Sequence, residues 1–296
     1  MKVVDSLICS MIFFFHAPFW CNTKPSSLCP VLGIGSGCSA FEGPMMLAEI
    51  VSEKRDLDWL IRIPIAHRGL HDHSTGIPEN SQAAFERAVK NGYPIELDVR
   101  LLRDSEVVVF HDKSLERMTG HQGVIKDCDS REIRRIKLLD SQQTIPLLSD
   151  VLDDIAGQVS LIIEVKNENH RVGPLEKALW QRMSSYKGKY AIVSFNPFTL
   201  KWFRINAPTV IRGQLSSDFR GERLPFYMKF LLRNLLMNHV SRPDFILFDI
   251  RCLPFWAALR AKKRGIPLLG WTTRNQEEHF KAMEFCDNVI FEGYQP

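Results

Sequence analysis

The feature that most constrains the fold of this chain is an alternation of strand-like and helix-like segments. It begins near Ile63 and continues almost to the C-terminus. Alternation of this kind over about 230 residues predicts an α/β fold, because parallel strands are joined by crossover helices that cover the sheet. Eight apolar runs favour a closed TIM (β/α)8 barrel. The predicted strands are Ile63–Ala66, Tyr93–Val99, Val107–Phe110, Val159–Val165, Tyr190–Phe195, Val210–Leu215, Phe245–Ile250 and Ile266–Trp271. The predicted helices are Ser81–Lys90, Ser149–Ala156, Pro174–Ser185, Phe198–Asn206, Leu224–His239 and Pro254–Arg264.

The third run, Val107–Phe110, departs from this alternation. No helix fits between Asp98 and Val107, so two arrangements remain open. Either one crossover has lost its helix, or the chain turns back as a hairpin at "DSE" and Val289–Phe291 supplies a further strand. A small insertion, roughly residues 113–147, follows this third run, where a barrel places its substrate loops.

The first 44 residues show no periodic pattern, and we place the barrel domain at residues 45–296. The apolar stretch Leu7–Trp20 resembles the core of a signal peptide but is short for a membrane span. Two explanations remain open. Either the natural product starts at Met45 or Met46, or residues 1–44 are a signal-like or anchoring segment.

Three carboxylates are predicted to meet at the carboxyl ends of the strands, where TIM barrels carry their active sites. Glu96 and Asp98 alternate with apolar residues in "IELDV" and therefore share one face of a strand, and Glu164 ends the next long apolar run. Crowded carboxylates repel one another unless a cation binds between them. All-oxygen ligands select a hard cation, so Mg²⁺ or Ca²⁺ is the expected metal.

Two histidines and two basic residues also end predicted strands. His67 and His111 could exchange protons near neutral pH, while Arg68 and Lys166 stand where an anionic group would bind. A cation, two basic side chains and an acid/base pair together suit cleavage of a phosphate ester. The competing interpretation, in which Arg68 and Lys166 only form structural ion pairs, leaves both histidines without a role.

Glu79 lies in "GIPENSQAAF", a loop that enters a helix capped by Asn80 or Ser81. It could interact with the helix dipole, or it could face the metal from behind the carboxylate ligands. The sequence does not choose between these two positions.

The blocks "AHRG", "PENSQAAF", "IELDV", "VVVFHD", "LERMTG" and "IIEVK" resemble the signature of glycerophosphodiester phosphodiesterases. That family consists of metal-dependent TIM barrels that release glycerol 3-phosphate and an alcohol. The resemblance implies His67 and His111 as the acid/base pair and a substrate-covering role for the insertion. It also implies metal ligation by the three carboxylates, phosphate contacts from Arg68 and Lys166, and a place for Trp271 at the substrate. Two segments depart from the family pattern: "DSE" replaces the usual Asp-Gly turn, and "DNVIFEG" replaces the closing Asp-Gly-Ile-x-Thr-Asp segment.

Charge and apolar patterning bear on partners and location. The net charge of +4 gives no reason to expect nucleic acid, although basic residues outnumber acidic ones fourteen to four between Lys201 and Arg274. The segment Phe226–Val240 is either a barrel helix or an interfacial helix that contacts a membrane.

From the motifs and the charge together we expect a cytoplasmic hydrolase of small glycerophosphodiesters. The alternatives are a membrane-associated lysophospholipase D and a non-catalytic binding module. The "HDH" at His71–His73 resembles the metal motif of amidohydrolases, but Phe195 and Gln214 stand where that class needs histidines.

Overall fold

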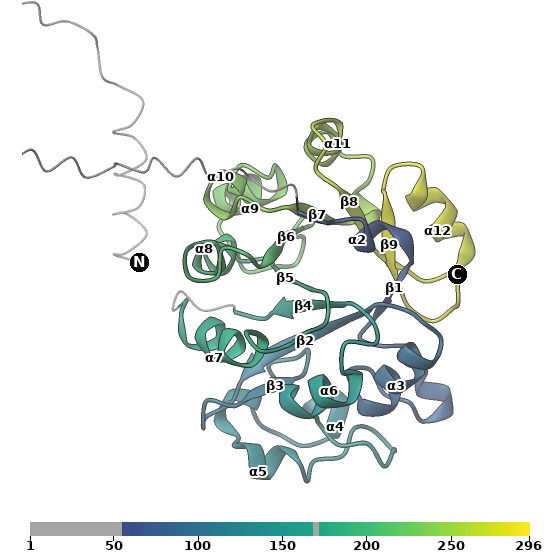
Figure 1. Cartoon of the computed structure of the whole chain (residues 1–296), viewed down its shortest axis with the longest axis vertical. Helices are drawn as coiled ribbons and strands as arrows, with labels where there is room; N and C mark the ends of the chain where they lie inside the picture. Colours follow the sequence, from purple (N-terminus) through teal and green to yellow (C-terminus); the bar gives the residue numbers. More distant parts are fainter. Residues whose placement is uncertain (1–54, 168–171) are drawn as a thin grey trace, which may run out of the picture. The chain divides into compact units, whose positions relative to one another are not determined.

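The computed structural model describes residues 55–167 and 172–296, and Figure 1 shows the course of the chain. The division that we expected between residues 44 and 45 falls outside the described residues. Within the part of the chain that the structure describes, no helix is long and apolar enough to cross a membrane.

The sheet closes into a barrel of parallel strands, which confirms the predicted fold class. β1 pairs with β9 on one side and with β2 on the other, and the remaining strands follow in the order β9-β8-β7-β6-β5-β4-β2. The strands are β1 (Ile65–His67), β2 (Ile95–Leu101), β3 (Val107–Val109), β4 (Leu161–Val165), β5 (Tyr190–Ser194), β6 (Ile211–Ser216), β7 (Phe245–Asp249), β8 (Leu268–Thr273) and β9 (Asn288–Phe291).

β3 lies outside this parallel barrel. It pairs antiparallel with β2, with Val109 opposite Val99, so the hairpin is the arrangement observed and β9 takes the eighth place in the barrel. The reason lies in the turn at "DSE", where Ser105 has a φ of 68°. Such a tight turn reverses the chain, whereas a parallel return needs a long crossover. The hairpin carries His111 back toward β2, since the Phe110 amide donates to the carbonyl of Asp98 at 2.9 Å.

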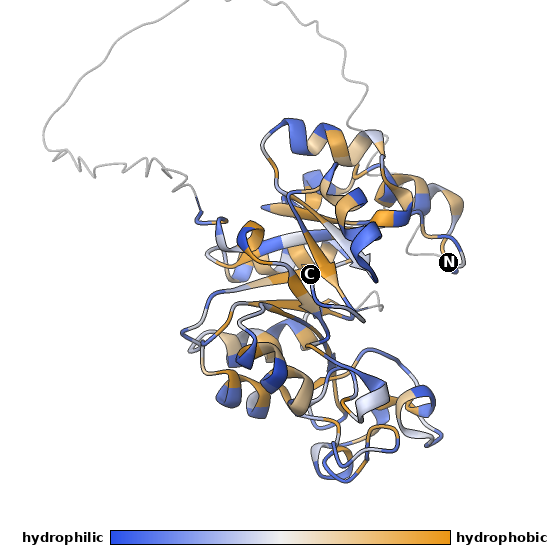
Figure 2. Ribbon diagram, turned by 90° about the vertical axis from the view of Figure 1, so that its right-hand side faces the viewer, coloured by the Kyte–Doolittle hydropathy of each residue, from blue (hydrophilic) through white to orange (hydrophobic). Residues whose placement is uncertain are grey.

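Helices cover the outside of the barrel and pack on the outward apolar faces of its strands. In Figure 2 the strands are coloured mainly as hydrophobic, while the helices alternate between hydrophobic and hydrophilic residues. The helices are α2 (Trp59–Arg62), η1 (His73–Thr75), α3 (Gln82–Lys90), α4 (Glu116–Thr119), η2 (Ile125–Asp127), α5 (Ser130–Ile133), α6 (Leu148–Ile155), α7 (Pro174–Met183), α8 (Pro197–Asn206), α9 (Phe226–Arg233), α10 (Asn238–Ser241), η3 (Ile250–Cys252), α11 (Trp256–Lys263) and α12 (Gln276–Met283).

Two helical regions differ from the prediction. The segment Leu224–His239, predicted as one helix, is divided into α9 and α10, with Leu235 between them at a φ of 56°. A left-handed residue ends an α-helix, and burial of Leu232, Leu235 and Met237 holds this bend against the barrel. α12 was not predicted, because Ala282 is its only buried residue and its apolar stripe is therefore weak.

The insertion that follows β3 contains α4, η2 and α5 and has a small core of its own. Met118, Ile125 and Ile133 are buried there together with Val108 and Phe110 of the β3 segment. The insertion is thus packed on the hairpin that carries His111, which fixes its position beside the carboxyl ends of the strands.

The interior of the barrel has an apolar layer beneath a polar one. Ile65, Ile162, Leu269 and Ile290 belong to one buried cluster inside the barrel. Because side chains alternate between the two faces of a strand, the residue two positions later on each strand also faces inward. Those next residues are His67, Glu164, Trp271 and Glu292. The alternation therefore places these four side chains directly above the apolar layer inside the barrel.

Candidate active site

The three carboxylates predicted as metal ligands lie together in the structure. Glu96 and Asp98 project from β2, and Asp98 stands opposite Glu164 of β4 in the strand register. All three are buried, and one oxygen of each lies within 4.8 Å of the others. Three buried acceptor groups held this close form a cluster that can hold a cation.

The electrostatics of the cluster are unequal. Burial, followed by repulsion from Asp98 and Glu164, raises the pKa of Glu96 well above its ordinary value. Burial and Asp98 also raise the pKa of Glu164, although Lys166 opposes the shift. Burial acts in the same direction on Asp98, but attraction by Lys166 and Arg68 outweighs it and lowers its pKa. Negative charge therefore concentrates on Asp98, at the centre of the cluster.

Lys166 and Arg68 lie against these carboxylates. Lys166 Nζ is 3.0 Å from Asp98 Oδ1 and 2.8 Å from Glu164 Oε1, while Arg68 Nε is 3.2 Å from Asp98 Oδ2. Their predicted contact with a phosphate stays a prediction. Both cations nevertheless border the cluster, where an anion approaching a bound metal would meet them.

Asn80 also holds Asp98. Its amide Nδ2 donates to Asp98 Oδ2 at 2.8 Å, from a backbone with a φ of 53°. Ser81 is the residue that caps α3, because its hydroxyl accepts from the Ala84 amide. The sequence left Asn80 and Ser81 as alternatives for the cap and did not predict that Asn80 contacts a metal-ligand candidate.

Glu79 lies behind Arg68, and its closest described partners are arginines. Its Oε1 accepts from Arg68 at 2.6 Å and from Arg117 of α4 at 2.7 Å. Burial raises its pKa, but the hydrogen bond and charge of Arg117 and the charge of Arg68 lower it to about 2. Glu79 therefore stays ionised and links the insertion to the cation that borders the carboxylates.

His111 is held by the neighbouring Asp112. His111 Nδ1 lies 2.6 Å from Asp112 Oδ1, and the other oxygen of Asp112 accepts from Arg117 Nε at 2.6 Å. Burial lowers the pKa of His111 to about 4, so the ring is neutral at physiological pH. An ionised carboxylate only accepts hydrogen bonds, which places the proton on Nδ1 and leaves Nε2 as the nitrogen available for proton exchange.

His67 is held in the same way by Glu292, a residue that sequence reasoning missed. Its Nδ1 lies 2.5 Å from Glu292 Oε2, and its Nε2 is 3.9 Å from Glu96 Oε2. Burial lowers the pKa of His67, although the hydrogen bond to Glu292 acts against this shift. The sequence held two signals, because Glu292 directly follows the apolar run Val289–Phe291 and lies in the closing segment "DNVIFEG".

Trp271 lies on the inner face of β8 and packs edge-on against Phe195, with ring centroids 5.6 Å apart. Its indole Nε1 is buried without a hydrogen-bond partner among the described residues. A buried aromatic ring of this kind can pack on the carbon atoms of a small ligand. Its contact with substrate stays a prediction.

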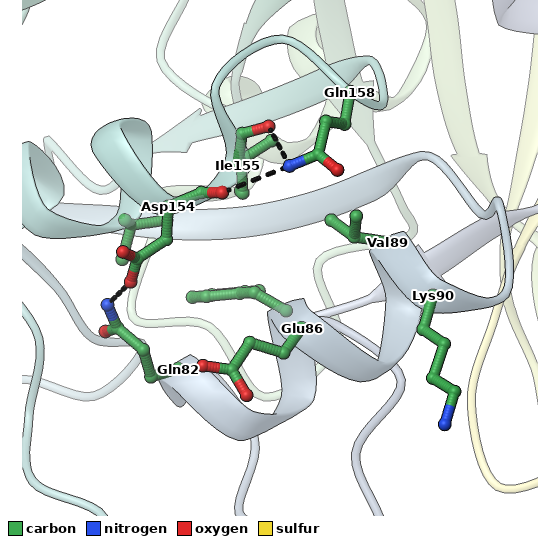
Figure 3. Close-up of a pocket in the computed structure, with 9 residues that line it drawn as sticks. Gln82, Glu86, Val89, Lys90, Asp154, Ile155 and Gln158 are labelled. Atoms are coloured by element: carbon green, nitrogen blue, oxygen red, sulfur yellow. Dashed lines mark hydrogen bonds between the residues drawn. The ribbon is translucent and has the colours of Figure 1, made fainter.

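A cavity of about 310 Å³ lies elsewhere, between α3 and α6 on the outside of the barrel. Figure 3 shows that the amide of Gln82 donates to the carboxylate of Asp154. It also shows that the amide of Gln158 donates to the backbone carbonyls of Asp154 and Ile155. Its polar side chains are partly engaged with one another, and it holds none of the histidines or carboxylates described above. We therefore assign the chemistry to the rim of the barrel and not to this cavity.

Comparison with known proteins agrees with this geometry. The family model described as "Glycerophosphoryl diester phosphodiesterase family" matches residues 67–293. A glycerophosphodiester phosphodiesterase of Caldanaerobacter subterraneus is 32% identical over 224 residues, covering 72% of this chain and 86% of that protein. A solved phosphodiesterase of Oleispira antarctica, in complex with the product sn-glycerol-3-phosphate, superimposes with a TM-score of 0.67 at 22% identity. The match covers 79% of this chain and 93% of that one. The crystal structure of a glycerophosphodiester phosphodiesterase from Thermotoga maritima gives a TM-score of 0.61 at 25% identity, covering 77% and 93% of the two chains.

Proposed function

The chain belongs to the glycerophosphoryl diester phosphodiesterase family of phosphoric diester hydrolases, and from this membership we propose that it cleaves glycerophosphodiesters to glycerol 3-phosphate and an alcohol. One observation supports this most directly. The rim of the barrel holds a buried cluster of three carboxylates together with two histidines, each of which is bound to a carboxylate through Nδ1.

We propose that Glu96, Asp98 and Glu164 hold a divalent cation, Mg²⁺ or Ca²⁺. The donor set fits such an ion, because it offers only carboxylate oxygens and its charge is not fully balanced by Lys166 and Arg68. When bound, a divalent cation would draw electron density from a phosphoryl group and so make the phosphorus easier to attack.

The protein groups would then handle the protons. In this proposal one histidine accepts the proton of the attacking hydroxyl or water through Nε2, and the other histidine protonates the departing alkoxide. Either His67 or His111 could take either role. Arg68 and Lys166 would bind the phosphate oxygens, and Trp271 would pack on the glycerol carbons.

A substrate panel tests this function. The purified protein should release glycerol 3-phosphate from glycerophosphocholine or glycerophosphoethanolamine, lose this activity in chelator, and regain it with Mg²⁺ or Ca²⁺. Glu96→Gln should be far less active than Glu86→Gln, a matched substitution on the exposed side of α3. If no diester is hydrolysed, the proposal is wrong and a non-catalytic binding module becomes the better account. Turnover that persists in chelator would show that the reaction does not need the proposed metal.

A membrane-associated lysophospholipase D remains a second proposal. α9 leaves the side chain of Phe226 83% exposed and that of Phe230 55% exposed, one helical turn apart. The helix follows β6, so it begins at the same end of the barrel as the candidate site. Lys229 lies between the two phenylalanines and could attract anionic lipid.

The membrane proposal predicts binding to vesicles that contain phosphatidylserine, and hydrolysis of lysophospholipids. The double variant Phe226→Ser/Phe230→Ser should lose vesicle binding and lysolipid turnover but keep its activity on soluble diesters. Phe280→Ser on α12 is the control, because Phe280 is also exposed, at 69%. Equal losses in the test and control variants would exclude a specific role for α9.

A further inference from the structure

Glu292 occupies a position at which this chain departs from the usual closing segment, and it lies against a histidine of the candidate site. We propose that Glu292 is a positioning residue that fixes the tautomer and orientation of His67. This inference rests on the proposed function, because it assumes that His67 exchanges protons with the substrate or the attacking group.

The barrel itself brings the two residues together. β1 and β9 are hydrogen-bonded neighbours in which Ile65 stands opposite Ile290 and Ala66 opposite Phe291. His67 ends β1 and Glu292 directly follows β9, so the two residues meet at the rim. Their side chains make the short contact between Nδ1 and Oε2, and the carboxylate is only 20% exposed. Glu292 is held at the end of its strand, because its amide donates to the carbonyl of Thr273 in β8 at 3.0 Å, and a side chain anchored to the sheet in this way is better fixed than one on a free loop.

The carboxylate is also held in the ionised form. Arg274 Nε lies 2.9 Å from Glu292 Oε1. Burial raises the pKa of Glu292, but the hydrogen bond and charge of His67 and the charge of Arg274 lower it far below its ordinary value. Since an ionised carboxylate can only accept, the ring must donate through Nδ1–H. Nε2 then carries the lone pair and is the nitrogen that faces Glu96.

His71 does not replace His67 in this arrangement. Its Nε2 is 3.9 Å from the same Glu292 oxygen, which is too long for a hydrogen bond. Glu292 is also not one of the residues of the carboxylate cluster found among the described residues. Glu292 is thus best placed to act through His67, in the way that Asp112 holds His111.

The proton balance is simple. If Nε2 takes a proton from the attacking hydroxyl, the ring becomes a cation while Glu292 stays a carboxylate beside Nδ1–H. If the ring instead begins as the cation, it gives its Nε2 proton to the leaving alkoxide and returns to the same neutral tautomer. In both directions the proton on Nδ1 does not move, so Glu292 orients the ring without exchanging a proton.

The test compares Glu292→Gln with Glu278→Gln. Glu278 is a suitable control because it accepts a hydrogen bond from the backbone of Arg274 at 2.8 Å, so the same loop is perturbed without touching a histidine. The first readout is the ¹⁵N NMR signal of the His67 ring in metal-free protein, assigned by its loss in His67→Asn. We expect an Nδ1–H tautomer in the wild type and in Glu278→Gln, and a mixture of tautomers in Glu292→Gln.

The second readout is turnover. Loss of a carboxylate that orients a catalytic histidine lowers kcat by up to about 10⁴-fold, so we expect at least about 10²-fold in Glu292→Gln, with KM nearly unchanged. Glu292→Asp keeps the charge and should recover part of the loss. If Glu292→Gln does not fold, Glu292→Ala, which also removes the charge, replaces it in both measurements. An unchanged tautomer in the Glu292 variant, or wild-type kcat, would overturn the positioning role. Because the NMR measurement needs no substrate, it tests this contact even if the proposed activity is absent.

Discussion

Replacing Glu96 by Gln should stabilise the metal-free protein while weakening its binding of metal. Glu96 is buried beside Asp98 and Glu164, with carboxylate oxygens within 4.8 Å of one another. At an effective dielectric constant of about 20, two like charges at this distance repel by about 3 kcal/mol. Lys166 and Arg68 offset part of the two repulsions, so we take the net penalty of ionised Glu96 as about 1 to 3 kcal/mol.

The sign of the pH dependence follows from the raised pKa of Glu96, which has an ordinary value of 4.5. Between that value and the raised pKa, the folded protein binds a proton that the unfolded chain has released. The free energy of unfolding therefore falls as the pH rises through this window, and the penalty is complete only above the raised pKa. Gln at position 96 carries no charge at any pH, so the variant avoids this loss.

Thermal unfolding in chelator measures the effect. Relative to wild type, Glu96→Gln should unfold at a Tm about 2 to 12 °C higher at pH 8, and the difference should shrink toward pH 5. Calorimetric titration with Mg²⁺ or Ca²⁺ should show a loss of affinity of at least about 10-fold. Glu86→Gln should match the wild type in both measurements, because its side chain is exposed on α3.

Two results would refute this reasoning. If Glu96→Gln melts below the wild type at pH 8 without metal, the carboxylate stabilises the fold and the cluster is not strained by repulsion. If the variant binds metal with wild-type affinity, Glu96 is not a ligand.

Three further predictions follow from the geometry. His111→Ala should bind the metal with wild-type affinity in calorimetry, yet its kcat should fall by about 10² to 10⁴-fold. Loss of metal binding in this variant would instead show that His111 supports the carboxylate cluster. Gly69→Ala should cost about 1 to 3 kcal/mol more than Gly76→Ala in denaturant unfolding, because a Cβ at Gly69 would lie 2.9 Å from Ala84 whereas one at Gly76 would meet no atom within 4 Å. Both glycines have positive φ, so equal losses would mean that backbone strain alone explains the effect. A protein without residues 1–44 should keep its Tm and turnover, because the described barrel closes between β1 and β9 without them, and a clear loss of either would contradict the predicted boundary.

The barrel and the carboxylate cluster could be predicted because both depend on local period. Alternation in "IELDV" fixes which side chains share a face, and parallel strands bring their carboxyl ends to one rim. The same rules failed to decide the position of Val107–Phe110, since a short apolar run does not reveal whether its partner is parallel or antiparallel. They also predicted one helix where the left-handed residue Leu235 separates α9 from α10. Local period does not reveal such a bend, because its stability depends on packing against the strands of the barrel.

The partners of the site residues could not be predicted for a different reason. Lys166 and Arg68 were expected at a phosphate, and the structure sets both within about 3 Å of Asp98. A periodic pattern places a side chain on a face but does not choose among the groups that it can reach there. Glu292 was missed because its contact depends on the closure of the barrel, which joins the two ends of the domain.

That closure has a consequence for synthesis of the protein on the ribosome. His67 and Glu292 are 225 residues apart in the chain. At ordinary rates of translation, about 10 to 45 s pass between the appearance of the histidine and that of its carboxylate partner. During this interval the emerging polypeptide already contains Glu96, Asp98 and Glu164, but no ninth strand lies beside β1. A polypeptide that stops before Glu292 would therefore retain the three carboxylates and lack the partner that holds the imidazole of His67. In the nascent protein, the contact that holds His67 can therefore form only after Glu292 has been synthesised, well after the three carboxylates.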